Sequence, residues 1–309
     1  MEFKHFIEAQ QLTSDLLFSL FKEADSIRAN LEQHSSDLKG KILATLFYEP
    51  STRTRLSFET AMLRLGGQVI STENAKEFSS AIKGESMEDT ARVVGSYSDF
   101  IVIRHHEEGT AKRASEVSRA HIINAGDGKG QHPTQALLDL YTIYRELGKV
   151  EGLKIAMVGD LASGRTVRSL CYLLGKFKNN EIIFVSPENL KMRDDIKEYL
   201  TKHGVVFKEE TSLNEVLKVA DIIYMTRIQK ERISSEDYER ARGQFVINEE
   251  TLKLVKPEAR VMHPLPHVEE ISLPVSVEQN DKRIAYFRQS ENGVYIRMAL
   301  LKFMDSTNS

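Results

Sequence analysis

The chain has 309 residues, 41% of them hydrophobic, which is enough for two domains with substantial cores. Its formal net charge of −3 lacks the basic excess that general nucleic-acid binding requires, so any anion site must be local. The single cysteine, Cys171, excludes an intrachain disulfide. Neither a signal peptide nor a membrane span is recognisable, and we therefore expect a cytoplasmic protein that binds neither membranes nor nucleic acids.

The first informative segment joins an apolar run to the start of a polar helix. Residues 41–47 have the pattern of a buried strand, and the apolar spacing after residue 55 predicts a helix. A helix N-terminus offers free N–H groups to an anion, and hydroxyls and a guanidinium would add donors for phosphate. Either Arg53 or Arg55 could supply the guanidinium. The alternative is an ordinary helix cap beside surface arginines. The predicted donors are Ser51, Thr52 and Thr54 with one of these arginines.

Strands and helices then alternate through the first half of the chain. This alternation predicts a parallel sheet with helices on both faces, which binds its ligands at the carboxyl ends of the strands. Residues 71–86 interrupt it with a polar stretch, where we expect a long exposed loop. The expected strands lie near residues 68–70, 100–104 and 121–124, and the expected helices near 85–97, 110–119 and 133–147.

A second alternating series follows a glycine-containing junction. The sequence therefore predicts an α/β protein of two similar domains, 1–148 and 149–289, each a mostly parallel sheet flanked by helices. The last helix, near 292–303 within 290–309, is expected to pack back onto the first domain. The second series has expected strands at 154–158, 181–185, 205–208, 221–225 and 260–262, and expected helices near 165–178, 190–203 and 213–219.

Further polar side chains lie where strands of the first domain end. Arg104 closes one strand, and His132 precedes Pro133 at the start of a helix. The positive end of the helix dipole favours a neutral imidazole, which could polarise a carbonyl group. A solvated arginine and a histidine that caps its own helix are the alternatives. The intervening glycines lack the spacing of a dinucleotide-binding loop, and they are Gly126, Gly128 and Gly130.

Strand ends of the second domain carry a different set of groups. Arg165 opens a helix, while Arg227 and Gln229 follow a later strand. Two arginines and an amide could hold a small dicarboxylate. The sequence His-Pro-Leu-Pro at 263–266 predicts a tight turn, compatible with a cis bond before Pro266, whose exposed carbonyls could receive an ammonium group.

In this order, the segments resemble the aspartate carbamoyltransferase catalytic chain over nearly the whole sequence. The resemblance implies transfer of a carbamoyl group from carbamoyl phosphate to L-aspartate in pyrimidine synthesis, in a cleft between the domains, without a cofactor or a metal. Its motifs are Ser51-Thr52-Arg53-Thr54, Arg104 before Glu107-Glu108-Gly109, His132-Pro133-Thr134-Gln135, Gly164-Arg165-Thr166, Thr226-Arg227-Ile228-Gln229 and His263-Pro264-Leu265-Pro266.

The resemblance also implies roles for individual residues. Carbamoyl phosphate would be bound by Ser51, Thr52, Arg53, Thr54, Ser79, Lys83, Arg104, His132 and Gln135. Catalytic roles within this set would fall to Arg53, Thr54, Lys83, Arg104 and His132. Aspartate would be bound by Lys83, Arg165, Arg227, Gln229, Leu265 and Pro266. In the family, Ser79 and Lys83 come from the neighbouring subunit of a homotrimer with shared active sites, which would give the polar 71–86 segment a purpose.

The chemistry agrees with such a donor set. Attack of an amine on a carbamoyl carbon builds negative charge on the carbonyl oxygen, and fixed donors stabilise that charge more in the transition state than in the ground state. Because both substrates are anionic, holding them together requires several cations. No covalent nucleophile or metal is needed.

Some positions depart from the usual family pattern. Ala162 and Ser163 stand where Lys-Tyr is common, and His267 stands where arginine is usual. In the best-known regulated member this pair contributes to contacts between trimers, so its absence puts that style of cooperativity in doubt. A separate regulatory chain is a partner that the resemblance leaves open. The residues that support a closed state in the family are present: Glu49, Arg165 and Arg232.

Two rival functions follow from the same residues. A carbamoyltransferase for ornithine would share the phosphate motifs, but such enzymes carry cysteine where this chain has Pro264, and they lack the arginine clamp. A catalytically silent subunit that binds phosphate metabolites would require a broken donor set, and none is visible.

Overall fold

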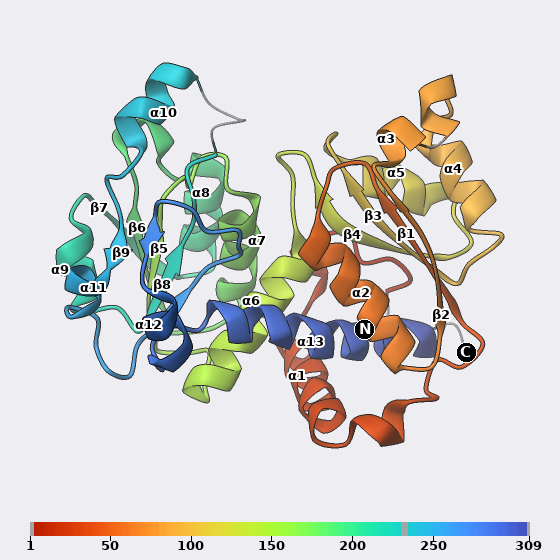
Figure 1. Cartoon of the computed structure of the whole chain (residues 1–309), viewed down its shortest axis with the longest axis horizontal. Coiled ribbons are helices and arrows are strands. Elements are labelled where there is room, and N and C mark those ends of the chain that lie inside the picture. The colour runs from red at the N-terminus through yellow and green to blue at the C-terminus, as the bar shows by residue number, and fades with distance from the viewer. Residues whose placement is uncertain (1–2, 79, 230–233, 308–309) are drawn as a thin grey trace. The chain divides into compact units, whose positions relative to one another are not determined.

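The structure of the chain is a computed structural model that describes residues 3–78, 80–229 and 234–307. It divides into two compact units (Figure 1). Unit 1 comprises Met1–Leu138 and Glu291–Ser309, and unit 2 comprises Asp139–Ser290. Both divisions fall inside helices, α6 (Pro133–Leu147) and α13 (Tyr286–Ser306). A continuous helix therefore crosses the division, whereas the sequence suggested a junction at the glycine-containing segment after residue 147.

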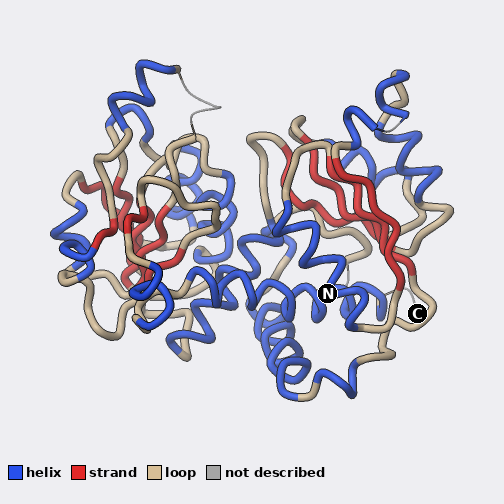
Figure 2. The backbone as a smooth tube through the Cα atoms, in the orientation of Figure 1, coloured by secondary structure: helices blue, strands red, loops and turns tan. Residues whose placement is uncertain are grey.

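Unit 1 contains a four-stranded parallel sheet in the order β2-β1-β3-β4 (Figure 2). Its strands are β1 (Ile42–Phe47), β2 (Gln68–Glu73), β3 (Phe100–His105) and β4 (His121–Asp127). The chain leaves β1 toward β2 on one side and returns to β3 on the other. The carboxyl ends of β1 and β3 therefore form the switch point where α/β sheets bind ligands.

Helices cover both faces of this sheet. Ala44 and Ile101 point to one face, where they pack in an apolar cluster with Ala91 of α4 (Met87–Val94) and Ala114 of α5 (Thr110–Val117). Thr45 points to the opposite face, as strand alternation requires, and its Oγ1 donates to Glu59 Oε1 of α2 (Thr52–Arg64) at 2.9 Å.

The end of α13 belongs to this second layer of unit 1. Arg297 Nη1 donates to Ser57 Oγ of α2 at 2.6 Å, and Lys302 pairs with Glu23 of α1 (Ser14–Ala29). Arg28 of α1 also donates to Asn292 Oδ1, at 2.9 Å. Three helices that lie far apart in the sequence are thus connected.

Residues 71–86 form no long loop, so that sequence-based prediction was wrong. β2 continues to Glu73 and is followed by α3 (Ala75–Phe78) and by a 3₁₀ turn, η3 (Ser80–Lys83). β2 is an edge strand whose residues are exposed or half-buried. Such a strand needs no apolar alternation, which explains why its pattern was not recognised.

Unit 2 contains a five-stranded parallel sheet in the order β10-β8-β5-β6-β7. Its switch point lies between β5 and β8, where Val158 and Met225 are register partners. The strands are β5 (Lys154–Val158), β6 (Glu181–Val185), β7 (Val206–Glu210), β8 (Ile222–Met225) and β10 (Arg260–Met262), with a separate pair β9 (Ile247–Asn248) and β11 (Ile271–Ser272).

The helices of unit 2 are shorter than the sequence suggested. The one expected at 190–203 begins at Asp194, after η4 (Glu188–Leu190). The C-terminal helix, in contrast, is longer than expected, because it starts at Tyr286 and not near residue 292. The remaining helices are α7 (Arg165–Leu174), α8 (Asp194–Lys202), α9 (Leu213–Leu217), α10 (Ser235–Ala241), α11 (Glu249–Leu252) and α12 (Val275–Asn280). No helix in the described ranges has both the length and the apolar content needed to cross a bilayer.

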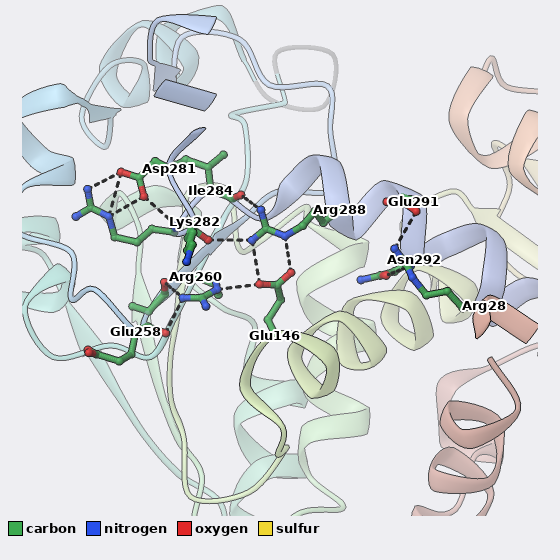
Figure 3. A network of polar contacts seen from close by, with 12 residues as sticks. Arg28, Glu146, Glu258, Arg260, Asp281, Lys282, Ile284, Arg288, Glu291 and Asn292 are labelled. Carbon is green, nitrogen blue, oxygen red and sulfur yellow. Dashed lines mark hydrogen bonds and ion pairs between the residues drawn. The ribbon is translucent and has the colours of Figure 1, made fainter. Parts of the chain in front are cut away.

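An ion-pair cluster fixes the end of α6 within unit 2 (Figure 3). Glu146 accepts from Arg260 Nε at 2.8 Å and from Arg288 Nε and Nη2 at 2.7 and 2.9 Å. Burial acts to raise the pKa of Glu146, but the hydrogen bonds from the two arginines outweigh it and lower the pKa below its ordinary value. The cluster joins α6, β10 and α13.

Candidate active site

Four polar side chains at the start of α2 have no partner in the described part of the chain. Ser51 is the N-cap residue, but its hydroxyl makes no capping hydrogen bond, and no hydrogen bond or ion pair engages the side chains of Thr52, Arg53 or Thr54. The alternative of an ordinary serine cap is therefore excluded. Since α2 follows the carboxyl end of β1, these donors lie at the switch point of unit 1.

The two arginines of this segment have different environments. Arg55 donates to Ser71 Oγ at 3.0 Å and to Glu73 Oε2 at 2.9 Å, so its guanidinium is already occupied. Arg53 is exposed overall, yet partial desolvation of its guanidinium lowers the pKa below the ordinary value. Of the two, Arg53 is the one available to an anion.

Arg104 lies at the end of β3 beside this donor group. It is the register partner of Phe47 in β1, and its carbonyl accepts from Tyr48 N at 2.8 Å. Its guanidinium lies 3.6 Å from Glu49 Oε2 through Nε and donates from Nη1 to Ala125 O at 3.4 Å. The carboxylate and the carbonyl hold the cation at the sheet edge.

The loop from β4 into α6 brings His132 and Gln135 to the same edge of the sheet. His132 is 4% exposed, and its carbonyl accepts from Gln135 N and Ala136 N in the first turn of α6. The Gln135 side chain is 8% exposed on that turn. Unit 1 thus brings together Ser51–Thr54, Arg104, His132 and Gln135.

Lys83 does not join this group in the structure. Lys83 is exposed at the end of η3, and its amine makes no polar contact with the described residues. Ser79 lies outside the described residues, as does Arg232.

In unit 2, the loop after β5 positions Arg165 as the first residue of α7, where it is 7% exposed. Gly159 is required before it: with φ near 116°, an added Cβ would come within 2.2 Å of Thr226 O. This close approach joins the loop after β5 to the loop after β8. Thr226 Oγ1 completes the junction by donating to Val158 O at 2.9 Å.

Arg227 and Gln229 follow Thr226 and are both half-buried. The Gln229 amide makes no hydrogen bond with the described residues, whereas Arg227 and Arg165 have polar partners. Unit 2 therefore has two cations and one amide at its own switch point, and their role in binding a dicarboxylate stays a prediction.

The His-Pro-Leu-Pro turn follows β10 and contains the cis bond before Pro266 that the sequence suggested. Leu265 N donates to His263 Nδ1 at 2.8 Å, so the ring proton lies on Nε2, which is 2.9 Å from Glu270 Oε1. Burial opposes ionisation of Glu270, but the contact with His263 outweighs it and lowers the pKa of that carboxyl.

The other end of the turn is held by His267. Its Nε2 lies 3.1 Å from Glu278 Oε1, and the ring packs edge-on against Tyr286 with centroids 5.4 Å apart. The Tyr286 hydroxyl also donates to Glu278. A histidine–carboxylate pair thus occupies the position where the family usually has arginine.

Sequence reasoning missed the carboxylates that support these segments. Asp127, Glu270 and Glu278 were not among the predicted site residues, although Asp127 stood inside the glycine-rich stretch, a usable signal. Within 3–78, 80–229 and 234–307, no group of three or more His, Cys, Asp or Glu side chains is arranged to hold a metal ion.

Both halves of the sequence match one family. Residues 4–145 match the carbamoyl-P binding domain of aspartate/ornithine carbamoyltransferases, and residues 151–304 match the Asp/Orn binding domain. The chain belongs to the aspartate/ornithine carbamoyltransferase family. The fold expected from the sequence, two α/β units with parallel sheets, is confirmed.

Similar proteins point to the aspartate branch of this family. The chain is 56% identical over 303 residues to aspartate carbamoyltransferase 3, chloroplastic, of Pisum sativum, covering 96% of this chain and 76% of the relative. The structure of the catalytic subunit of M. jannaschii aspartate transcarbamoylase matches with TM-score 0.90 and 47% identity, over 99% of both chains. Aspartate transcarbamoylase from Trypanosoma cruzi in complex with carbamoyl phosphate and aspartate matches with TM-score 0.90 and 38% identity, over 97% of this chain and 95% of that one. The resemblance to the aspartate carbamoyltransferase catalytic chain is confirmed.

Proposed function

We propose that this chain transfers the carbamoyl group of carbamoyl phosphate to the α-amino group of L-aspartate, giving N-carbamoyl-L-aspartate and phosphate for pyrimidine synthesis. Aspartate carbamoyltransferase activity is its function. The structural observation that supports it most directly is the group of unpartnered donors at the start of α2. Phosphate is the anion that such a helix terminus favours.

For carbamoyl phosphate, we assign binding to the residues of unit 1. Thr52, Arg53 and the α2 backbone amides would hold the phosphate. The guanidinium of Arg53 is partly desolvated, and hydrogen bonds to a bound anion would replace the water that it has lost. Ser51 and Arg104 complete the phosphate contacts.

The carbonyl oxygen of carbamoyl phosphate would accept hydrogen bonds from Thr54, Arg104 and His132. As the amine attacks, negative charge grows on that oxygen, and donors that are already positioned lower the barrier without rearranging. Gln135 would accept a hydrogen bond from the carbamoyl amine. Breaking of the bond to phosphate then releases a leaving group that Arg53 and Arg104 stabilise.

For aspartate, we assign binding to unit 2. Arg165, Arg227 and Gln229 would clamp the two carboxylates, because planar guanidinium groups match carboxylate geometry. The carbonyls of Leu265 and Pro266 would receive the amino group. The domain roles follow: the chain up to residue 148, with 290–309, for carbamoyl phosphate, and 149–289 for aspartate.

A homotrimer is our proposal for the assembly. Lys83 is a cation without a described partner on an exposed turn, which suits a residue that acts in a neighbouring subunit's site, together with Ser79. The Clostridium perfringens and Methanocaldococcus jannaschii relatives are named catalytic subunits. Light scattering tests the stoichiometry, and mixing Lys83→Ala with His132→Ala chains tests sharing, since only shared sites would regain activity.

The cytoplasm is our proposal for the location of this activity. One buried, free cysteine, Cys171, fits a reducing compartment. Cell fractionation tests it.

Substrate choice is tested by measuring phosphate release and carbamoyl product with L-aspartate, with L-ornithine and with neither, for wild type, His132→Ala and Arg227→Ala. We expect aspartate-dependent turnover that both substitutions abolish. Dependence on ornithine would overturn the substrate assignment. Tight phosphate binding without turnover would point to a silent subunit.

A further inference from the structure

The glycine-rich loop between β4 and α6 contains a buried carboxylate that the proposed function does not use. Asp127 is the last residue of β4 and is 6% exposed. It makes no ion pair, and its partners within the described residues are all uncharged N–H donors. Burying a carboxylate without a cation costs free energy, so Asp127 depends on these hydrogen bonds for its stability in the fold.

The two oxygens of Asp127 bind different loops. Oδ2 accepts from Gly109 N at 2.9 Å, in the loop between Arg104 and α5. Oδ1 accepts from Gln131 N at 2.9 Å, in the loop that leads to His132, and from Asn124 Nδ2 at 3.2 Å. One carboxylate therefore connects the loop that follows β3, the strand of Arg104, with the loop that leads to His132.

The glycines around Asp127 make room for this connection. A Cβ at Gly128, where φ is near 48°, would come within 2.5 Å of His106 O, and a Cβ at Gly130 would come within 2.7 Å of Asp127 Oδ1. Gly128 N also donates to His105 O at 2.9 Å. The glycine spacing that failed as a dinucleotide motif is explained by the close packing of two loops around one carboxylate.

We propose that Asp127 is a positioning residue that holds Arg104 and His132 in mutual register, so that both can meet the carbonyl oxygen of carbamoyl phosphate. The proposal rests on the proposed function for the identity of that substrate. Geometry, not charge, is the basis of this role. A negative charge at an anion site repels the ligand, and removing it would by itself strengthen phosphate binding.

Asp127→Asn is the first test. The amide has the same size as the carboxylate, but one of its two acceptor oxygens is replaced by an NH2 donor, which cannot accept a hydrogen bond from a backbone N–H. We expect kcat/KM for carbamoyl phosphate to fall about 10- to 100-fold, as misplacement of catalytic groups by about 1 Å does, while KM for aspartate changes less than about threefold. Phosphate affinity, measured by titration calorimetry, should fall as well.

Gly130→Ala is the second test, since the added methyl displaces the Asp127 carboxylate without altering its charge. It should give the same division between the two substrates. The matched control is Glu107→Gln, which removes a negative charge from the same loop as Gly109. Among the described residues, the Glu107 side chain pairs with Arg113 alone, at 3.0 Å. We expect this control to bind phosphate as the wild type does, or slightly more tightly.

A double-mutant cycle separates positioning from general damage. If Asp127 acts through Arg104, then Asp127→Asn should cost little further activity in an Arg104→Ala background. Three results would overturn the proposal. They are additive losses in the cycle, wild-type kinetics in both Asp127→Asn and Gly130→Ala, and equal losses for both substrates that follow the melting temperature. Should wild type show no turnover, the proposed function fails, and the phosphate titrations still decide the role of Asp127.

Discussion

The switch points of the two units treat their polar side chains differently. In unit 1, the side chains of Ser51–Thr54 have no partner in the described chain, although Arg104 beside them contacts Glu49 and Ala125 O, and the Asp127 carboxylate joins the neighbouring loops. In unit 2, Arg165 and Arg227 already interact with other groups, and the turn at 263–267 is held by two histidine–carboxylate pairs. The Ser51–Thr54 donors of unit 1 can therefore bind an anion without breaking a described side-chain contact. The two arginines of unit 2 already interact with other groups before a ligand binds.

This difference bears on affinity and order of binding. A ligand that binds donors without internal partners breaks no protein contact, so its hydrogen bonds contribute fully to the binding free energy. A ligand that displaces internal contacts gains only the difference in free energy between the new contacts and the old ones. We therefore expect carbamoyl phosphate to bind the free protein more tightly than aspartate does.

Replacing Arg53 by alanine should have the largest effect. This cation has no other task in the described chain, and we expect kcat/KM for carbamoyl phosphate to fall about 10³-fold, as for loss of a charged transition-state donor. Steady-state kinetics with both substrates varied measures it. The control is Arg55→Ala, which removes the neighbouring arginine already bound to Glu73, and it should stay near wild-type activity. Equal damage from both variants would contradict the distinction between the two arginines.

A second pair of arginines sharpens the comparison in unit 2. Arg165→Ala should raise KM for aspartate about 100-fold and leave KM for carbamoyl phosphate nearly unchanged, because a bidentate carboxylate contact is lost. Arg168, one turn further along α7, pairs with Asp195 at 2.7 Å. Arg168→Ala should lower thermal stability without changing KM for aspartate, and a raised KM there would argue against our assignment.

The ion-pair cluster of unit 2 should affect stability. Glu146→Gln leaves Arg260 and Arg288 without their anion, and we expect unfolding free energy to fall by about 2 kcal/mol. Because the pKa of Glu146 lies below its ordinary value of 4.5, its contribution is present above pH 4.5 and is lost as pH falls through the folded-state pKa. Denaturant curves between pH 3 and 7 should therefore differ less between wild type and variant at the acidic end.

The smallest effect concerns His267. Its replacement by alanine frees one end of the Leu265–Pro266 turn, and KM for aspartate should rise about three- to tenfold, as loss of one polar contact with a carboxylate would give. His267→Gln keeps a donor for Glu278 and should recover most of the affinity. Loss of affinity in the glutamine variant alone would show that the Glu278 contact is irrelevant.

Periodicity predicted most of the sheet framework because buried strands carry a continuous apolar signal. β5, β6 and β10 were predicted at their observed bounds. The edge strand β2 was cut short because its residues are exposed or half-buried, and α3, a helix of only four residues, was missed. α1, which packs apolar residues such as Leu17 and Phe21, was not predicted, although Thr13 is a capping residue at its start.

For the candidate site, the sequence indicated the residue types at strand ends but not their partners. Residue types alone left Arg53 and Arg55 equivalent; the family resemblance favoured Arg53, and the contacts of Arg55 to Ser71 and Glu73 give the physical distinction between them. Those contacts join residues of α2 to β2, a pairing set by tertiary structure. The supporting role of Asp127 likewise depends on an approach between two loops that sequence spacing does not encode.

The division of the chain inside α13 has a consequence for protein synthesis. Unit 2 is one continuous segment, but unit 1 needs Glu291–Ser309, and Ile296, Leu300 and Met304 of that segment are fully buried. During translation, every residue of unit 2 leaves the ribosome before unit 1 receives its last helix. Unit 1, whose synthesis begins first, is therefore completed last. A nascent chain halted at Ser290 would contain every residue of unit 2 but only part of unit 1.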